Sequence, residues 1–217
     1  MPRATIASLS RTPGKKPGSS PTKTRGDTRE RLLKAAVELF DRYGFEGTSM
    51  RALASAVGLK APAVYNHFKS KEEILLVAVN SALEAFNDSV VAQDDAHLPA
   101  LVRLDGMIDR HVSYQIENYN VARSNDRLLS IDVIDRFDGP SRKKIRGTMR
   151  LYFNTLSEIV GDAAGSRASA AAVRVTALSI GTMCDHVNDW YRADGSLSQR
   201  EVIALLSRLA KGMIKAL

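Results

Sequence analysis

Apolar residues recur at intervals of three and four along most of this chain, which is the spacing of one face of an α-helix. The pattern predicts a broken helical stretch over 121–137 and clearer helices over about 27–44, 70–91, 99–118, 141–160, 167–191 and from 198 onward. β-branched runs with a period of two, which would indicate strands, do not occur in the sequence. We therefore predict an all-α protein.

Polar residues mark the start of several of these helices. A short polar side chain can accept a hydrogen bond from a free backbone N–H of the first turn, and a Glu three residues later can return the bond. Pairs with this spacing occur at Asp27 and Glu30, Ser70 and Glu73, and Ser198 and Glu201. We expect each pair to form a capping box at a helix N-terminus.

Residues 48–71 predict two short helices joined by a tight turn. Thr48 is placed to cap the first helix, because its hydroxyl can accept a bond from the first turn. Gly58 stands where the chain must turn, and Pro62 falls in the first turn of the second helix. Two helices with a Gly-containing turn are typical of a helix-turn-helix that reads DNA.

The second short helix has one apolar and one polar side. Val64 and Phe68 are four residues apart and are expected to face the core. The polar residues are then left to face outward: Lys60, Tyr65, Asn66, His67 and Lys71. Basic, hydroxyl and amide groups on one exposed helix suit a charged partner that forms hydrogen bonds.

Charge is distributed unevenly along the chain, whose formal net charge is +7. Residues 1–71 contain 14 Lys/Arg and 5 Asp/Glu, a net of +9, whereas residues 72–217 contain 17 and 19, a net of −2. A basic region is expected where a protein binds phosphates, and here it coincides with the helix-turn-helix.

We divide the chain into three parts. Residues 1–26 have six Lys/Arg, no acidic residue and too little apolar surface to offset the entropy of ordering, so we predict a disordered basic arm. The arm either lies along DNA or is only a solubilising extension. Residues 27–71 are assigned to the helix-turn-helix DNA-binding domain, and residues 72–217 to a helical effector-binding and dimerisation domain.

Composition argues against several other classes of protein. The single cysteine, Cys184, cannot form an intramolecular disulfide, and the sequence has neither a membrane-length apolar run nor a signal-peptide pattern. We therefore expect a cytoplasmic protein without a membrane partner. Phosphate-binding glycine motifs and zinc-ligand spacings are absent, and Cys184 and His186 project to different sides of a helix. We expect no catalytic residue, no metal site and no cofactor, and hence no enzyme.

The segment from Asp27 to Val79 resembles the TetR (tetracycline-repressor) family of bacterial transcription factors. The resemblance rests on the run AAVELFDRYGFEGTSMRALASAVGLKAPAVYNHFKSKEEIL, with its Tyr, His, Phe and Lys at positions 65, 67, 68 and 71. The later run DWYRADGSLSQREVIALL, from Asp189, is similar to a subgroup that often regulates lipid or acyl-CoA catabolism. The chain departs from the family at Lys60, where a Ser or Thr usually caps the recognition helix.

The resemblance implies a homodimer that binds a palindromic double-stranded operator, blocks transcription, and is released by a small apolar effector such as an acyl-CoA or an aromatic compound. By position it assigns phosphate contacts to Ser49, Arg51, Tyr65, His67 and Lys71. The base edges would face Ala61, Pro62, Ala63 and Asn66. With Thr48 and Lys60 added, the expected DNA-binding set is Thr48, Ser49, Arg51, Lys60, Ala61, Pro62, Ala63, Tyr65, Asn66, His67 and Lys71.

Residue chemistry agrees with these roles. Small apolar side chains suit thymine methyl groups, and the amide of Asn66 can make two bonds to adenine, although it can equally bond only a phosphate or water. One short helix cannot supply tight specific binding, so two half-sites one DNA turn apart, and hence a symmetric dimer, are expected.

The effector site is expected among Met and aromatic residues with a few polar groups on three helices of the body, a composition that suits a tunable apolar pocket. The candidates are Met107, His111, Tyr114, Asn118, Met149, Tyr152, Phe153, Met183, His186 and Trp190. The alternative for each is an ordinary core position.

The dimer surface is expected on the last two helices, which would form a four-helix bundle with those of a second copy. A stripe on 167–191 would contribute Ile180, Cys184, Val187 and Tyr191; alternatively this helix is internal core. Other functions stay open: a DNA-binding regulator that activates transcription or lacks an effector, and, less favoured, a helical adaptor or an enzyme.

Overall fold

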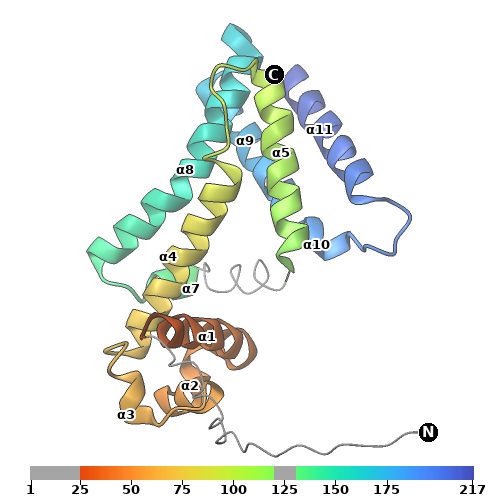
Figure 1. Ribbon diagram of the computed structural model, residues 1–217. Coiled ribbons are helices and arrows are strands. Elements are labelled where there is room, and N and C mark those ends of the chain that lie inside the picture. Colours follow the sequence, from red (N-terminus) through yellow and green to blue (C-terminus); the bar gives the residue numbers. More distant parts are fainter. Residues whose placement is uncertain (1–24, 120–130) are drawn as a thin grey trace, which may run out of the picture.

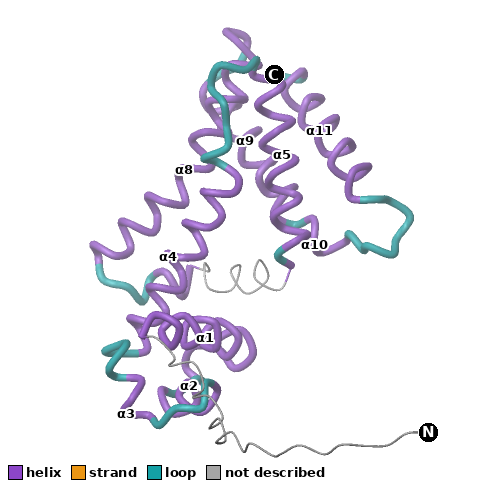
Figure 2. The backbone as a smooth tube through the Cα atoms, in the orientation of Figure 1, coloured by secondary structure: helices purple, strands orange, loops and turns teal. Residues whose placement is uncertain are grey.

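A computed structural model describes residues 25–119 and 131–217. Throughout these ranges the chain forms helices and no strand, which confirms the predicted all-α fold (Figure 2). Residues 1–24 of the predicted arm and residues 121–130 of the predicted broken stretch lie outside the described residues, whereas Arg25 and Gly26 begin the first helix.

The chain forms a small lower domain and a larger body above it (Figure 1). The lower domain consists of α1 (Arg25–Gly47), α2 (Met50–Ala56) and α3 (Ala61–Val64). The body consists of α4 (Lys71–Val90), α5 (Ala100–Glu117), α7 (Ile131–Ile134), α8 (Gly139–Ala164), the 3₁₀ turn η1 (Gly165–Arg167), α9 (Ala170–Asp185), α10 (Val187–Trp190) and α11 (Gln199–Lys215). None of the helices in the described ranges has the length and apolar character needed to cross a bilayer.

The first helix is interrupted at a glycine, near its predicted end. Gly44 has φ of 73° and ψ of 168°, a conformation that disfavours a residue with Cβ, so the helical path breaks there. Within the described chain α1 already runs from Arg25, so Asp27 lies in its first turn and is not the predicted cap. An acidic side chain in the first turn still favours the helix through its dipole.

The N-cap of α2 is Ser49 and not Thr48. The Ser49 hydroxyl accepts a hydrogen bond from the Ala52 N–H at 3.1 Å. Thr48 is 2% exposed, and its hydroxyl lies 2.9 Å from the carbonyl oxygen of Gly44 and 3.2 Å from that of Leu39. The prediction was wrong by one residue because Thr48 is turned inward to cap the carbonyl end of α1.

The turn between α2 and α3 has the predicted glycine at its centre. Gly58 has φ of 72°, a value that L-residues rarely adopt. Ser70 then caps α4 by accepting a bond from the Glu73 N–H at 3.2 Å, as predicted. The Glu73 carboxylate accepts a bond from the Lys69 N–H at 2.6 Å and not from the Ser70 N–H, so the expected box is displaced by one residue.

The final helix has the expected capping box. Ser198 accepts a bond from the Glu201 N–H at 3.3 Å, and the Glu201 carboxylate accepts one from the Ser198 N–H at 2.8 Å. By contrast, the helix predicted over 167–191 is divided into α9 and α10 at His186, which has φ of −89° and ψ of 13°. Asn188 donates to the backbone carbonyl of Gln115 on α5 at 2.7 Å, and this tertiary contact holds the chain turned.

Two apolar clusters stabilise the molecule. The upper cluster joins α4, α5, α8, α9 and α11 around fully buried side chains such as Met107, Ile159 and Ile180. The lower cluster contains the buried residues of α1 to α4 and also takes in Ile134, Phe137 and Ile145 from α7, the turn after it and α8. The base of the body therefore shares a core with the lower domain.

Candidate DNA interface and effector site

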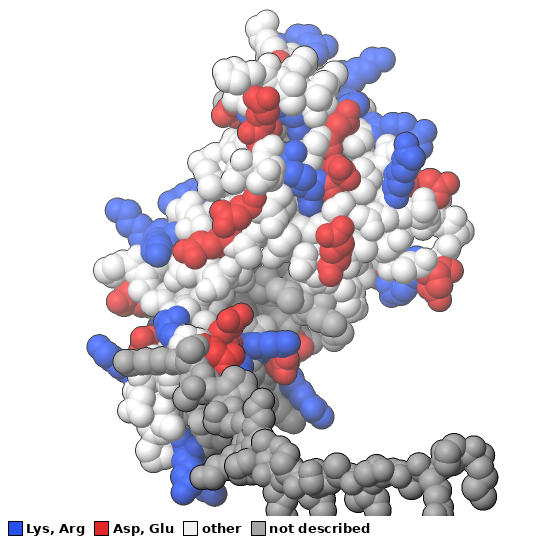
Figure 3. All heavy atoms as spheres, in the orientation of Figure 1, with Lys and Arg blue, Asp and Glu red and all other residues white. Residues whose placement is uncertain are grey.

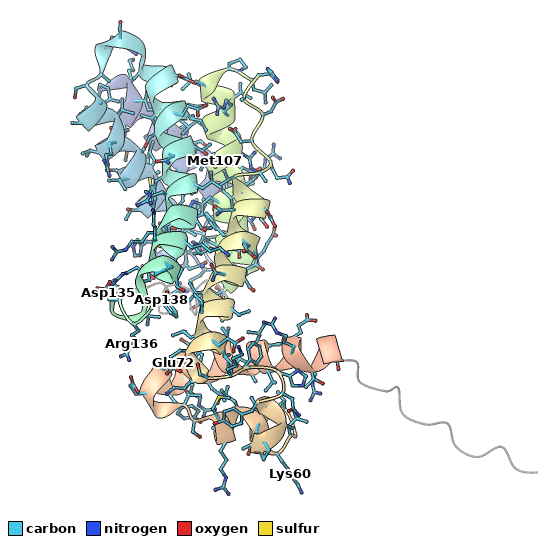
Figure 4. The ribbon with its side chains drawn as sticks, turned by 90° about the vertical axis from the view of Figure 1, so that its left-hand side faces the viewer. Lys60, Glu72, Met107, Asp135, Arg136 and Asp138 are labelled. Atoms are coloured by element: carbon cyan, nitrogen blue, oxygen red, sulfur yellow. The ribbon has the colours of Figure 1, made fainter. Side chains whose placement is uncertain are left out.

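The end of the lower domain that lies farthest from the body is formed by α2 and α3 (Figure 1). Lys60 projects from this end, away from the other helices (Figure 4). Tyr65 is 55% exposed and Asn66 is also exposed, whereas Val64 and Phe68 are buried, as predicted. The short helix thus presents polar groups to solvent over an apolar support.

The start of α3 lacks a side-chain cap. Lys60 occupies the N-cap position with extended backbone, and its side chain makes no capping bond. Pro62 lies at the first helical positions, where the loss of one N–H is tolerated. Since the Lys60 ammonium makes no ion pair with a described residue, it is available to an anionic partner.

Two arginines of α1 support the short helices from behind. Arg31 donates to the carbonyl oxygen of Val57 at 2.7 Å, at the end of α2. The guanidinium of Arg29 lies 4.7 Å from the centre of the Phe68 ring, a cation–π arrangement. α1 therefore fixes the orientation in which α3 is presented.

The sequence predicted that Lys71 faces outward. In the structure its side chain instead lies against the end of α1. Its ammonium donates to the carbonyl oxygen of Phe45 at 2.6 Å and lies 4.1 Å from the centre of the Phe45 ring. The carboxylate of Glu46 is 3.9 Å away. Because an ammonium has three donors, Lys71 retains the capacity to bind a phosphate from this position.

The remaining residues of the predicted set differ in accessibility. Arg51, Ser49 and Pro62 are exposed, while Ala61, Ala63 and His67 are half-buried, with the His67 Nδ1 buried and without a hydrogen-bond partner. Thr48 is removed from the set, because its hydroxyl is buried and bonded to α1. The basic side chains at the lower end are visible in Figure 3.

The body brings four of the predicted effector residues together around an aromatic ring that the sequence analysis missed. The Phe86 ring of α4 makes edge contacts with His111, Tyr114 and Tyr152 at centroid distances of 4.9, 5.3 and 5.3 Å. Phe153 adds a contact to Tyr152 at 5.2 Å. Phe86 lies three residues after Leu83 and seven after Val79, so its helical spacing was the signal available in the sequence.

A polar chain crosses this aromatic cluster. The fully buried His111 has its Nε2 at 3.0 Å from the Asp185 carboxylate and its Nδ1 at 2.8 Å from the Tyr152 hydroxyl. Because a carboxylate only accepts, Nε2 carries a proton, and in the neutral ring the Tyr152 hydroxyl then donates to Nδ1. Gln115 also donates to Asp185 at 3.4 Å. Burial raises the pKa of the Tyr152 phenol, which therefore stays protonated.

The other predicted effector residues are more scattered. Met107 is buried in the upper cluster and Met183 packs against it, whereas Met149 packs against the lower cluster. Asn118 ends α5, where its amide donates to the carbonyl of Tyr114 at 3.0 Å. His186 and Trp190 are exposed, and His186 pairs with Asp189 at 2.8 Å.

An open groove of about 400 Å³ lies elsewhere, where the loop after α4 meets α5 and α11. Half of its twelve lining residues are charged, and none of the predicted effector residues is among them. Arg103, buried at its floor, is paired with Asp94 at 2.8 Å and with Glu158 at 2.9 Å, so it ties the loop and α5 to α8.

The stripe predicted for the dimer surface faces inward. Ile180, Cys184 and Val187 are fully buried in the upper cluster, so the alternative, an internal core face, is the right one. Burial, helped by Asp185, raises the pKa of the Cys184 thiol to about 12, so this thiol stays protonated at neutral pH.

A short exposed helix in a three-helix domain, joined by a long helix to a helical body, defines the class of helix-turn-helix regulators. Residues 32–78 match the bacterial regulatory proteins of the tetR family, and residues 97–214 match the tetracyclin repressor-like C-terminal domain. The chain belongs to the TetR family of bacterial regulatory proteins.

Individual relatives are similar over different lengths. YezE, an uncharacterized HTH-type transcriptional regulator of Bacillus subtilis, is 37% identical over 65 residues, which are 30% of this chain and only 34% of YezE. The fatty acid metabolism regulator protein of Bacillus subtilis is 24% identical over 166 residues, 75% of this chain and 83% of that protein. The solved structure of AibR with isovaleryl coenzyme A and operator DNA shares the fold, with a TM-score of 0.67 and 22% identity over 88% of this chain and 97% of AibR.

Proposed function

We propose that this protein is a cytoplasmic transcriptional repressor that binds a palindromic DNA operator as a homodimer and is released by a small apolar effector. The observation that carries the proposal is the exposed face of α3, where Lys60, Tyr65 and Asn66 stand clear of the buried Val64 and Phe68. The protein acts by binding and has no enzymatic role.

Different residues are proposed to position the protein on the DNA backbone and to read the base sequence. Arg51, Lys60 and Lys71 supply positive charge for phosphates, and the Tyr65 hydroxyl supplies a donor on a rigid ring. Asn66 and the small side chains of α3 face the base edges. The proposal is supported by the exposure of all these polar side chains except Lys71, which is half-buried against the end of α1.

The homodimer is proposed to form through α8 and α9. These helices pack on one another, and their outward faces carry the exposed apolar side chains Leu151, Val175 and Leu178, which are 49%, 63% and 43% exposed. Exposed apolar side chains on two helices that pack together favour burial against a second copy, because covering them removes apolar area from water.

The effector is proposed to bind beside the aromatic cluster of Phe86, His111, Tyr114 and Tyr152. Aromatic walls with a few oriented polar groups suit an acyl chain or an aromatic ring that carries one polar end. An acyl-CoA is supported as the first class to test by the likeness to a fatty acid metabolism regulator and to AibR, whose structure contains isovaleryl coenzyme A.

Fluorescence anisotropy with a labelled palindrome from the protein's own promoter region tests the DNA-binding proposal. We expect saturable binding that exceeds binding to a scrambled duplex by at least about 10³-fold and that weakens steeply with salt. Equal affinity for both duplexes would contradict the proposal and favour a sequence-blind helical adaptor.

A thermal-shift screen with acyl-CoAs and aromatic acids tests the effector proposal. A ligand present at about 100 times its Kd stabilises a protein by about 2.7 kcal/mol, which such a screen detects. The same compound must then lower operator affinity in the anisotropy assay. If every stabilising compound leaves operator affinity unchanged, the regulator acts without an effector of these classes.

Activation is the alternative outcome of the same binding. Transcription from a reporter that carries the operator, with and without the protein, separates the two functions. Lower reporter output in the presence of the protein is expected for a repressor, and higher output identifies an activator.

A further inference from the structure

The body touches the lower domain through the turn between α7 and α8. Ile134 and Phe137 are 4% and 8% exposed, because both belong to the lower cluster. Arg136 stands between them with its side chain outside the core, beside the end of α1 (Figure 4). Since its buried neighbours anchor the turn, the backbone position of Arg136 follows that of α7 and the base of α8.

Two cations meet at the end of α1, on Phe45 and Glu46. Arg136 forms an ion pair with Glu46 Oε1, and its guanidinium lies 5.4 Å from the centre of the Phe45 ring. Lys71 approaches the same residues from α4, with its ammonium 3.9 Å from Glu46 Oε2 and 4.1 Å from the ring centre. The Glu46 carboxylate therefore contacts two cations. One is Arg136 of the body, and the other is Lys71, a predicted phosphate ligand.

We propose that Arg136 is a positioning residue for the phosphate contact of Lys71, and that the body controls DNA binding through it. The inference rests on the proposed function, in which Lys71 binds the operator. While Arg136 neutralises Glu46, the Lys71 ammonium is only weakly held by that carboxylate and is free to contact a phosphate. When Arg136 withdraws, Glu46 draws Lys71 into a closer pair and so holds its ammonium away from the DNA backbone.

Other charged groups at this junction are already engaged or point elsewhere. Asp135, the neighbour of Arg136, pairs with Arg146 at 3.1 Å and with Arg142 at 3.5 Å on the body side. Among the described residues, the ion pairs of Glu46 are those with Arg136 and Lys71. The competition for Glu46 therefore involves these two cations.

Operator anisotropy on full-length variants tests the proposal. Arg136→Gln should weaken operator affinity by about fivefold, as expected for one partly exposed charge pair. It should also lower the slope of log affinity against log salt by about 0.9, because one phosphate contact is lost. Arg142→Gln, which removes a neighbouring charge whose ion pair among the described residues is with Asp135, is the matched control and should leave both quantities unchanged.

The double variant separates this mechanism from a merely structural ion pair. Glu46→Gln with Arg136→Gln should restore affinity to within about twofold of the wild type, because no carboxylate is left to capture Lys71. Lys71→Gln should weaken the wild type but add little to Arg136→Gln. Arg136→Lys should retain most of the affinity.

Three results would overturn the inference: an Arg136→Gln variant as tight as the wild type, a double variant as weak as the single one, or full additivity of Arg136→Gln and Lys71→Gln. If the wild type itself does not discriminate its operator from a scrambled duplex, the proposed function fails. If it does discriminate, and Arg136→Gln has no effect, only the present inference fails.

Discussion

The fully buried His111 on α5 lies 3.0 Å from the partly exposed carboxylate of Asp185 on α9, and this contact links the two helices. The contact orients the imidazole so that its other nitrogen meets the Tyr152 hydroxyl at 2.8 Å. Three helices are therefore linked through one side chain that is completely withdrawn from solvent.

Removing the Tyr152 hydroxyl tests this link. Tyr152→Phe keeps the ring but leaves the His111 Nδ1 buried without a partner, so the free energy of unfolding should fall by about 1–3 kcal/mol. Urea denaturation measures the change. Tyr191→Phe, at a half-buried tyrosine of the same cluster, is the control and should cost distinctly less. Equal losses would mean that the polar chain contributes nothing beyond packing.

Tyr65→Ala should reduce operator affinity while leaving stability and oligomeric state intact, because the side chain is 55% exposed and is assigned to a phosphate. A loss of about 1–2 kcal/mol in binding free energy, similar for different operator sequences, is expected for a charge-assisted phosphate bond. Tyr43→Ala offers a matched control, because Tyr43 is 54% exposed on α1. Anisotropy titrations that show unchanged affinity for Tyr65→Ala would remove Tyr65 from the DNA interface.

Leu178→Asp should dissociate the proposed dimer, because it would bury a charge at the α8–α9 surface. Size-exclusion chromatography with light scattering should then report a monomer. Leu101→Asp, at a leucine of α5 that is 45% exposed against 43% for Leu178, should remain dimeric. If the protein remains dimeric in each of the variants Leu178→Asp, Val175→Asp and Leu151→Asp, the dimer interface lies on another surface.

Gly58→Ala should lower the free energy of unfolding by about 1–2 kcal/mol, since the residue has φ of 72° and no neighbouring atom would clash with a Cβ. The cost would therefore be conformational. Gly212→Ala, within α11 and equally free of close neighbours, should instead stabilise by up to about 1 kcal/mol. Urea denaturation should therefore show a lower free energy of unfolding for Gly58→Ala and a higher one for Gly212→Ala.

Acid should destabilise the fold in part through its helix caps. Hydrogen bonds from Ser198 lower the pKa of Glu201 below its usual value of 4.5, and bonds from Ser141 lower that of Asp138 below 3.8. A carboxyl group whose pKa is lower in the folded state stabilises the fold above its unfolded pKa and loses that contribution as the pH falls through its folded pKa. The melting temperature should therefore decline below a pH of about 4.5, and less steeply in Ser198→Ala.

Local sequence patterns were sufficient to predict most of the helices and the outward surface around α3, but not the break at His186 between α9 and α10. Helical spacing correctly predicted that Val64 and Phe68 are buried and that Tyr65 and Asn66 are exposed. A four-residue interval brings two side chains to one face of a helix. Gly58 ended α2 because few other residues tolerate its backbone conformation. These are short-range effects, and they depend little on the rest of the molecule.

Tertiary packing decided which residues of different helices contact one another. The stripe of Ile180, Cys184 and Val187 was visible in the sequence, but periodicity cannot tell a core face from a dimer face. The same limit applied to Thr48, which the end of α1 drew inward, and to the pairing of His111 with Asp185. Such contacts join distant segments, so their partners are set by which helices come to lie together and not by spacing along the chain.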